Sequence, residues 1–193
     1  MSEHRRPGRP QIADPDQIAR IAATLFAERG YAAVSMDDIA ERSGVSRRTL
    51  FRHFENKADL VWRDFFATYR RLAERLADPA TEPGMAGLRA AMRETLEVPG
   101  EEEEITRVRL RIIGASSEVF AAGVRGLGDM TEGLARQVAK AEHIDEDSLE
   151  ARAAGQAITG CILASAVWWA SHSDEPIVEV LDRALASLER GIA

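Results

Sequence analysis

Cysteine is almost absent from this sequence: Cys161 is the only one among 193 residues, and there are four histidines. A single cysteine cannot form an internal disulfide, and this usage is typical of proteins in a reducing compartment such as the cytoplasm. One cysteine and scattered histidines also do not make a four-ligand zinc site. No acid–base pair, activated nucleophile or metal-binding cluster stands out. We therefore expect a protein that is not an enzyme and holds no metal or cofactor.

Long apolar segments are also lacking. The first nine residues, MSEHRRPGR, are polar and basic, so they do not resemble a signal peptide. Residues 153–171 carry no charge, and their length approaches the roughly 20 residues that a membrane-spanning helix needs. Gln156, Thr159, two serines and two glycines make this segment too polar for lipid. We predict a helix buried in a bundle or an interface of a cytoplasmic protein, and no membrane span.

Basic residues are fewer than acidic ones, and the formal net charge is −7. The charge is unevenly distributed, because residues 1–70 hold 12 basic and 10 acidic side chains while residues 71–193 hold 13 and 22. Residues 42–57 contain five basic side chains and one acidic one, Glu55. A local basic face on an acidic molecule is typical of a small nucleic-acid-binding region, and less typical of a general polyanion-binding surface.

Strand patterns are missing as well, since no stretch alternates apolar and polar residues over a useful length. Instead, apolar residues recur at helical spacing, and serine, aspartate, glycine and proline mark the helix ends. The whole chain is therefore predicted to be all-α. The expected helices have these approximate ranges: 15–29, 36–42, 47–54, 58–76, 85–97, 102–113, 116–142, 146–172 and 177–190.

The first three predicted helices have the features of a helix-turn-helix. Ala40 is small enough to let the second and third helices approach closely, and Gly44 can adopt the positive φ of the turn between them. Val45 and Leu50 fill the space between these helices. The third helix then directs polar side chains outward, toward the major groove of double-stranded DNA: Arg47, Arg48, Thr49 and Arg52.

The run LFAERGYAAVSMDDIAERSGVSRRTLFRHFENKADL resembles the signature of the TetR family of transcriptional regulators from end to end. This resemblance covers roughly residues 12–62. It implies an all-α homodimer, with an N-terminal three-helix helix-turn-helix head (residues 1–57) and a C-terminal helical bundle, the body (residues 58–193), for dimerisation and ligand binding. The segments HFENKADLVWRDF and PGEEEEITRVRLRIIG are also similar to the subgroup of regulators found beside mycofactocin biosynthesis genes.

The resemblance assigns roles to individual residues of the head. Arg47, Arg48 and Thr49 match the positions that approach base edges, and Arg52 lies on the same outward face. Four residues match positions that usually meet the phosphate backbone: Ser35, Phe51, His53 and Lys57. Phe51 stands where the family most often has tyrosine, so it lacks a hydroxyl for phosphate and would make an apolar contact. Three arginines of the N-terminal segment either reach the minor groove or stay solvated: Arg5, Arg6 and Arg9.

The body is predicted to bind an apolar or amphipathic effector. The candidate pocket residues are large apolar side chains on helices expected to line the body: Trp62, Phe66, Tyr69, Met92, Leu96, Phe120 and Met130. Packing in the core without a ligand is the alternative for each of them. Effector binding would release a palindromic operator, as in a repressor. Two other interpretations are a body that docks a protein partner and an enzyme built on a helical bundle, for which no catalytic residues are present.

The dimer interface is predicted along helices 146–172 and 177–190, because the first is rich in small uncharged residues and the second has an apolar face. Its residues are Ala154, Ile158, Ile162, Trp169, Ile177, Leu181 and Leu185. Trp168 and Trp169 are about 100° apart on a helix, so they cannot both face the interface, and packing in the core alone is the alternative for this pair. The carboxylates of residues 101–104 are expected to complement a helix N-terminus. Four glycines within residues 123–133 indicate a break, a mobile stretch or a surface irregularity.

Overall fold

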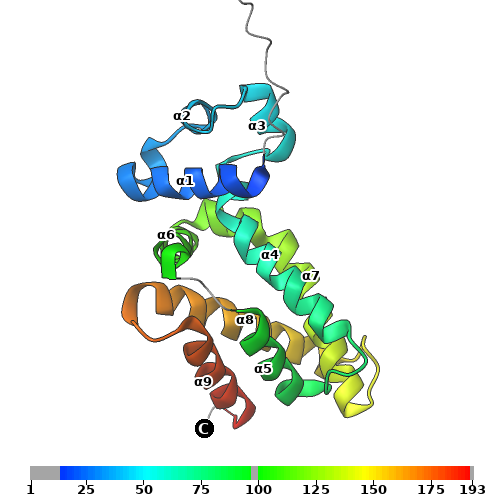
Figure 1. The fold of residues 1–193 in the computed structure, drawn as a ribbon. Helices are drawn as coiled ribbons and strands as arrows, with labels where there is room; N and C mark the ends of the chain where they lie inside the picture. Colours follow the sequence, from blue (N-terminus) through cyan, green and yellow to red (C-terminus); the bar gives the residue numbers. More distant parts are fainter. Residues whose placement is uncertain (1–13, 97–99, 192–193) are drawn as a thin grey trace, which may run out of the picture.

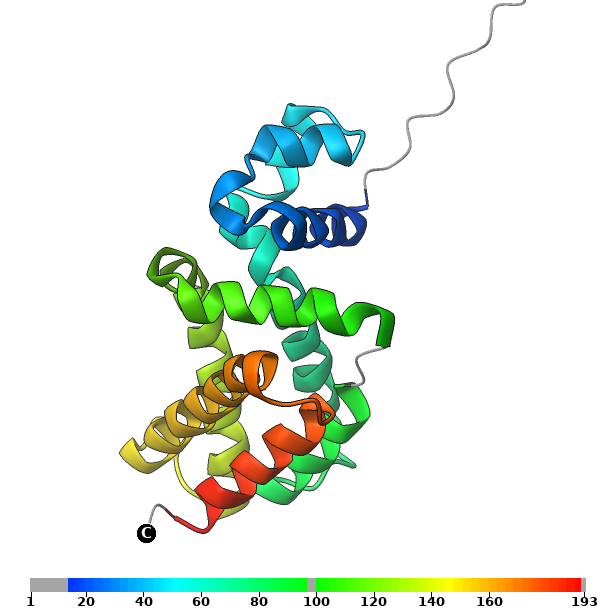
Figure 2. The ribbon, with the colours of Figure 1, turned by 90° about the vertical axis from the view of Figure 1, so that its left-hand side faces the viewer.

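A computed structural model describes residues 14–96 and 100–191 of the chain. Within these residues it contains nine α-helices, one short 3-10 helix and no strand (Figure 1). The predicted all-α class is therefore confirmed. A small group of helices, the head, stands above a larger body, and α4 leads from one to the other (Figures 1 and 2).

Four elements make up the described part of the head: α1 (Pro15–Arg29), the 3-10 helix η1 (Tyr31–Ala33), α2 (Met36–Arg42) and α3 (Arg47–His53). Local capping sets where these helices begin. The Asp14 carboxylate accepts a hydrogen bond from an amide in the first turn of α1, and the Ser46 hydroxyl accepts one in the first turn of α3. Ser35 and Asp38 form a capping box at the start of α2. Each helix lies where the sequence predicts it.

The second and third helices pack as a helix-turn-helix. Gly44 has a φ of 66°, a conformation that glycine adopts without steric cost, and the turn between α2 and α3 depends on it. Ile39, Ala40, Leu50 and Phe54 are buried in the core of the head. This core holds α3 at a fixed angle to the other helices, with its polar side free.

Among the described residues, six helices make up the body: α4 (Lys57–Ala77), α5 (Gly84–Thr95), α6 (Gly100–Ala115), α7 (Ser117–Glu142), α8 (Leu149–His172) and α9 (Ile177–Glu189). The central helix is α8, which packs against α6, α7 and α9. Helices α4 and α7 lie side by side, and α6 crosses beneath the head and contacts α1 (Figures 1 and 2). The head therefore meets the body through α1, α4 and α6.

By length and composition alone, α8 is long and apolar enough to cross a membrane. In the structure, Ile158, Ile162 and Ala166 of this helix are buried in the core of the body. The hydroxyl of Thr159 is also buried, and it donates a hydrogen bond of 2.9 Å to the Gly155 carbonyl oxygen one turn earlier. These are the contacts of a core helix.

The four glycines of residues 123–133 do not interrupt α7, which continues through all of them. Three of them lie directly against aromatic rings of α4, in the pairs Gly123–Trp62, Gly126–Phe66 and Gly133–Tyr69. A Cβ atom at Gly123 or Gly126 would overlap the ring, and one at Gly133 would overlap the hydroxyl oxygen of Tyr69. The prediction of a break is therefore wrong, because these glycines allow α4 and α7 to approach closely. We call this the α4–α7 contact.

Candidate functional site

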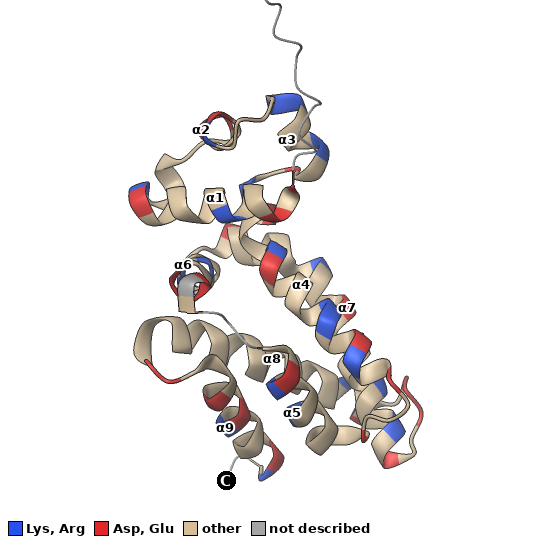
Figure 3. Ribbon diagram, viewed as in Figure 1, with Lys and Arg blue, Asp and Glu red and all other residues tan. Residues whose placement is uncertain are grey.

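One side of the head is formed by α3, whose basic residues lie at the end of the molecule farthest from the body (Figure 3). Five of its seven residues are exposed: Arg47, Arg48, Phe51, Arg52 and His53. Arg47 Nη1 lies 3.1 Å from Asp37 Oδ2, and its guanidinium lies 5.4 Å from the centre of the Phe51 ring. Because both side chains of this ion pair are exposed, it contributes little to stability, and the Arg47 guanidinium stays accessible from solvent.

Two predicted DNA-contact residues also take part in capping the helices of the head: Ser35 is the N-cap of α2, and Thr49 contacts Ser46, the N-cap of α3. Thr49 Oγ1 lies 2.8 Å from Ser46 Oγ, and Ser35 caps α2 together with Asp38. Hydrogen bonds from the Ser35 hydroxyl and amide, followed by one from Arg29, lower the pKa of the Asp38 carboxyl to about 2. These interactions fix the first turns of α2 and α3, the turns that would approach a DNA backbone.

The ammonium group of Lys57 points into the head. Nζ donates hydrogen bonds of 2.8 Å to the carbonyl oxygens of Tyr31 and Val34, and it lies 4.3 Å from the centre of the Tyr31 ring. An ammonium has three hydrogens to donate, and these carbonyl oxygens accept two of them. Lys57 therefore joins the start of α4 to η1. The other predicted DNA-contact arginines lie outside the described residues: Arg5, Arg6 and Arg9.

A cavity of about 390 Å³ lies in the body beside the head. Side chains from α1 and from every helix of the body line it, and most of its wall is apolar. The volume falls within the range of about 300–1,000 Å³ that is usual for small-molecule sites. Four of the predicted pocket residues line this cavity: Tyr69, Met92, Leu96 and Met130.

The other three predicted pocket residues are not in its wall. Trp62 and Phe66 belong to the α4–α7 contact, where their rings stack with centroids 5.1 Å apart and Trp62 Nε1 donates a 2.7 Å hydrogen bond to the Val119 carbonyl oxygen. Phe120 is 44% exposed. The prediction is corrected for these three. Phe120 of α7 lies at the surface, and α4 turns a different face to the cavity, which carries Val61, Phe65, Thr68, Tyr69 and Leu72.

The charged residues of the cavity wall all belong to α1, its N-cap, α4 and α6, and Arg109 of α6 is buried among them. Its side chain is 4% exposed and forms an ion pair with Asp64 through Nη1. Nε and Nη2 of the same guanidinium have no hydrogen-bond acceptor among the described residues. Burial, followed by the nearby charge of Arg20, lowers the pKa of Arg109 to about 10. The side chain is therefore still a cation at neutral pH.

Two ion pairs join α1 of the head to the body at this wall. Arg63 Nε lies 2.6 Å from Asp16 Oδ1, and Arg20 Nη1 lies 2.9 Å from Glu102 Oε1. Asp16, Arg20 and Glu102 also line the cavity. A molecule that fills the cavity would therefore lie against side chains that hold the head in place.

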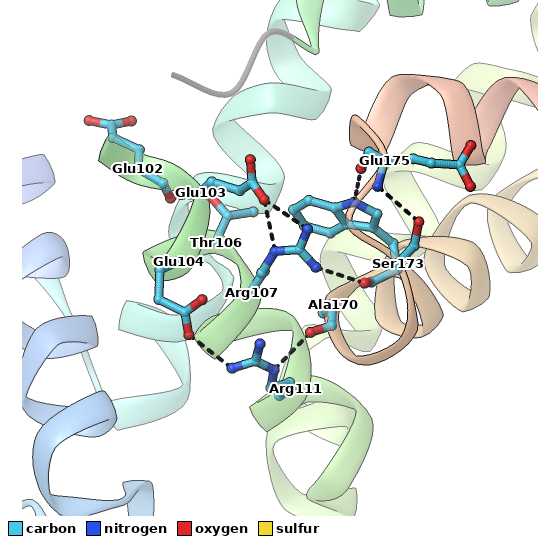
Figure 4. A network of polar contacts seen from close by, with 10 residues as sticks. Glu102, Glu103, Glu104, Thr106, Arg107, Arg111, Ala170, Ser173 and Glu175 are labelled. Atoms are coloured by element: carbon cyan, nitrogen blue, oxygen red, sulfur yellow. Dashed lines mark hydrogen bonds and ion pairs between the residues drawn. The ribbon is translucent and has the colours of Figure 1, made fainter. Parts of the chain in front are cut away.

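Helix α6 is bound to α8 by two arginines (Figure 4). Arg107 Nη1 donates a 2.9 Å hydrogen bond to the Trp169 carbonyl oxygen, and its guanidinium lies 3.9 Å from the centre of the Trp169 ring. Arg111 Nε donates a 2.8 Å hydrogen bond to the next carbonyl oxygen of α8. Glu103 and Glu104 form ion pairs with these two arginines. The acidic run therefore orders the arginines that hold α6 on α8, a role that sequence reasoning did not foresee.

Sequence reasoning also missed Arg109. A signal was present, because helical spacing places Arg109 on one face of α6 with Thr106, Leu110 and Ile113. All four residues line the cavity. An arginine within an otherwise apolar helical face marks a charge that the fold buries.

Both parts of the chain match known families. Residues 18–62 match the family of bacterial regulatory proteins of the tetR type. Residues 82–193, more than half of the chain, match the MftR C-terminal domain. This chain belongs to the TetR family. It is a DNA-binding transcriptional regulator of helix-turn-helix type, and the resemblance to the mycofactocin-associated subgroup is confirmed.

Relatives of this TetR-family chain agree with that assignment. It is 29% identical over 196 residues to MftR of Mycobacterium tuberculosis, named as a mycofactocin biosynthesis regulator, with 100% of this chain and 98% of the relative covered. It is 34% identical over 87 residues to the repressor KstR2 of Mycolicibacterium smegmatis, covering 42% of each chain. The solved structure of Thermus thermophilus FadR with lauroyl-CoA has a TM-score of 0.64 and 21% identity, covering 93% of this chain and 95% of FadR. That structure shows the shared fold.

The residues predicted to form the dimer interface of this TetR-family chain lie inside the protomer. Ala154 is half-buried, and the other six are buried: Ile158, Ile162, Trp169, Ile177, Leu181 and Leu185. Other helices of the same chain cover their side chains, so these six residues have almost no surface to offer a second subunit. Trp168 is 46% exposed and stacks on the His172 ring with centroids 5.4 Å apart. The outward tryptophan is therefore Trp168, and the choice of Trp169 is corrected.

Proposed function

We propose that this regulator is a cytoplasmic, homodimeric repressor that binds a palindromic operator and leaves it when an amphipathic small molecule enters the cavity of the body. One observation carries the proposal: the wall of the cavity includes Asp16 and Arg20 of α1, so the effector site and the DNA-binding head share residues. Thermus thermophilus FadR, which shares this fold, was solved in complex with lauroyl-CoA, and this supports a ligand role for the body.

The coupling between cavity and head follows from the ion pairs at their boundary. The Arg63–Asp16 and Arg20–Glu102 pairs join α1 to α4 and α6, on which α1 also packs. A ligand that enters between these elements changes the spacing of the two heads in a dimer. Its preference for the spacing that does not fit the operator needs to be only about 1–3 kcal/mol to give a useful response.

Sequence recognition is assigned to Arg47 and Arg48. A bidentate contact between arginine and guanine contributes about 1–3 kcal/mol of discrimination between bases. Duplexes selected from a random DNA pool by the wild-type protein should contain two inverted half-sites, since a two-fold dimer presents two α3 helices. Arg48→Ala should then lower the ratio of operator binding to random-DNA binding by about tenfold or more. An unchanged ratio in both Arg47→Ala and Arg48→Ala would refute this assignment.

The dimer interface is assigned to the hairpin of α7 and α8. Among the described residues outside the head, the large apolar side chains that are exposed all lie in this hairpin or its loop: Phe120, Val124, Ile144, Leu149 and Trp168. Large exposed apolar side chains in one region are typical of protein interfaces. Small residues of α8 that face outward lie on the same side as Trp168, at helical spacing: Ala153, Ala157, Gly160 and Ala164.

Sedimentation tests this interface directly. Ala164→Arg and Trp168→Arg should shift a dimer of wild type to a monomer at micromolar concentration, because a charge would be buried in an apolar contact. Ser187→Arg, at an exposed position of α9, is the matched control and should remain a dimer. A wild-type protein that sediments as a monomer contradicts the proposal.

Effector release is tested by titrating amphipathic compounds into the protein–operator complex and following both DNA release and tryptophan fluorescence. Met130→Trp, which fills the cavity, should remove the response to ligand while keeping DNA binding. Control by a protein partner is the second candidate, since Phe120 and Val124 are exposed. That candidate takes over if no compound enters the cavity and a bound protein covers the α7–α8 hairpin.

A further inference from the structure

We propose that the effector carries an anionic group and that Arg109 binds this group through the Nε–Nη2 edge of its guanidinium. The inference deepens the proposed function and rests on it, because it concerns the ligand that occupies the cavity. The class of effector is an amphiphile with one acidic head, such as a carboxylate, and an apolar chain or ring system.

The guanidinium of Arg109 has donors that no described residue satisfies. Arg109 is buried, lines the cavity, and has one ionic partner, Asp64, which meets Nη1. The Nε and Nη2 atoms are buried and have no acceptor among the described residues. Those two N–H groups lie along one edge in the fork geometry that binds both oxygens of a carboxylate. A buried donor without an acceptor is unfavourable, so an anion that supplies two acceptor oxygens would be bound strongly there.

The other charged residues of the cavity wall are more exposed than Arg109. Three acidic residues also line the cavity: Asp14, Asp16 and Glu102. Asp16 forms an ion pair with Arg63, and Glu102 forms one with Arg20. All three acids are at least partly exposed, and Asp64 is half-buried. Arg109 is the one charged residue of the cavity wall, among those described, that is buried. A ligand anion placed at its free edge is screened least and is attracted most strongly.

Most of the remaining wall of the cavity is apolar. Leu72, Met92, Ile113, Leu134 and Ile162 line it. An uncharged apolar molecule would satisfy these side chains but leave the arginine edge unpaired. A strongly polar anion without an apolar part would pair with the arginine but leave the apolar wall uncovered. An amphiphilic acid satisfies both.

Two fluorescent dyes with the same ring skeleton test the inference. 1-Anilinonaphthalene-8-sulfonate carries one anionic group, and N-phenyl-1-naphthylamine lacks it. The wild-type protein should bind the anionic dye at least about tenfold more tightly, which corresponds to the contribution of hydrogen bonds to a charged group. Decanoate should displace the bound dye, and 1-decanol should displace it at least about tenfold less effectively.

Variants locate the effect at one residue. Arg109→Met should lose the preference for the anionic dye and keep its affinity for the neutral dye within about threefold. Arg71→Met removes another arginine that lines the same cavity but is exposed, and it should keep the wild-type preference. Arg109→Lys keeps the charge without the fork, so it should bind the anion with intermediate affinity and provides a test if the methionine variant does not fold.

The outcomes separate the inference from the proposed function. If both dyes bind the wild-type protein equally well, or Arg71→Met abolishes the preference while Arg109→Met retains it, the role of Arg109 is overturned and the ligand cavity stands. If neither dye nor decanoate nor decanol binds, the ligand-responsive function itself fails. A preference that disappears only in the Arg109 variants supports the inference.

Discussion

Replacing Gly123 by alanine tests how α4 and α7 pack. A Cβ atom at this position would overlap the indole ring of Trp62. Trp62 has no free space to retreat into, because it is 2% exposed, stacks on Phe66 and donates a hydrogen bond to the Val119 carbonyl oxygen. The variant must therefore move either the ring or the whole of α7.

The expected size of the effect follows from opposing contributions. Overpacking a filled core costs about 2 kcal/mol, within the usual range for added methyl groups. Loss of the indole hydrogen bond costs about 1 kcal/mol more. Alanine is about 1 kcal/mol better than glycine inside a helix, which offsets part of this loss. Gly123→Ala should therefore lower the free energy of unfolding by about 2 kcal/mol.

The control lies one and a half turns further along the same helix. Gly128 has no heavy atom within 4 Å of the position of an added Cβ atom. Gly128→Ala should thus gain the helix-propensity term alone and raise the free energy of unfolding by about 0.5–1 kcal/mol. Urea unfolding followed by circular dichroism, at one protein concentration for all variants, measures both effects. Equal stabilisation by Gly123→Ala and Gly128→Ala would show that the α4–α7 contact is not close-packed, and the reasoning would be refuted.

Three further predictions concern polar residues. Lys57→Met should lower the free energy of unfolding by about 2 kcal/mol, because two carbonyl oxygens lose a charged donor. The salt dependence of operator binding should stay unchanged. If the slope of log affinity against log salt concentration instead fell by about one ion, Lys57 would be assigned to a phosphate contact. Asp38 has an ordinary pKa of 3.8 that folding lowers to about 2, so its carboxylate stabilises the fold above pH 4 and loses this effect as the pH falls toward 2. The stability difference between wild type and Asp38→Asn, measured by urea unfolding, should narrow over that interval, and a constant difference would contradict the pKa shift. Arg107→Met should lower the free energy of unfolding by about 2–3 kcal/mol, because the Trp169 carbonyl oxygen loses its donor and the indole ring loses a cation. A decrease below about 0.5 kcal/mol would contradict the role of Arg107 in holding α6 on α8.

The head could be predicted closely from sequence because local interactions determine it. Ser35 and Asp38 cap α2, Ser46 caps α3, and Gly44 supplies the positive φ of the turn. Each of these interactions joins residues a few positions apart in the chain, so the pattern of residue types already contains the geometry. The outward face of α3 follows from the same local rules.

The body could not be predicted to the same depth, because its contacts join residues far apart in the chain. Glycines spaced as in α7 are also typical of a flexible stretch, and only the aromatic side chains of α4 packed against Gly123, Gly126 and Gly133 show that these three are structural. Trp168 and Trp169 are equally apolar, and only the packing of other helices against α8 buries Trp169 and leaves Trp168 exposed.

The sequence by itself determined the fold class, the helix-turn-helix and the family, since helical periodicity, capping residues and turn glycines act within a few residues. The tertiary structure decided which apolar faces are core, which are surface and where a cavity remains. Apolar spacing identifies the side of a helix that avoids water, but does not identify its partner. For that reason Ile158 and Leu185, predicted at a dimer interface, are buried within the protomer. Arg109 was missed because burial of a charge depends on every helix packed around it.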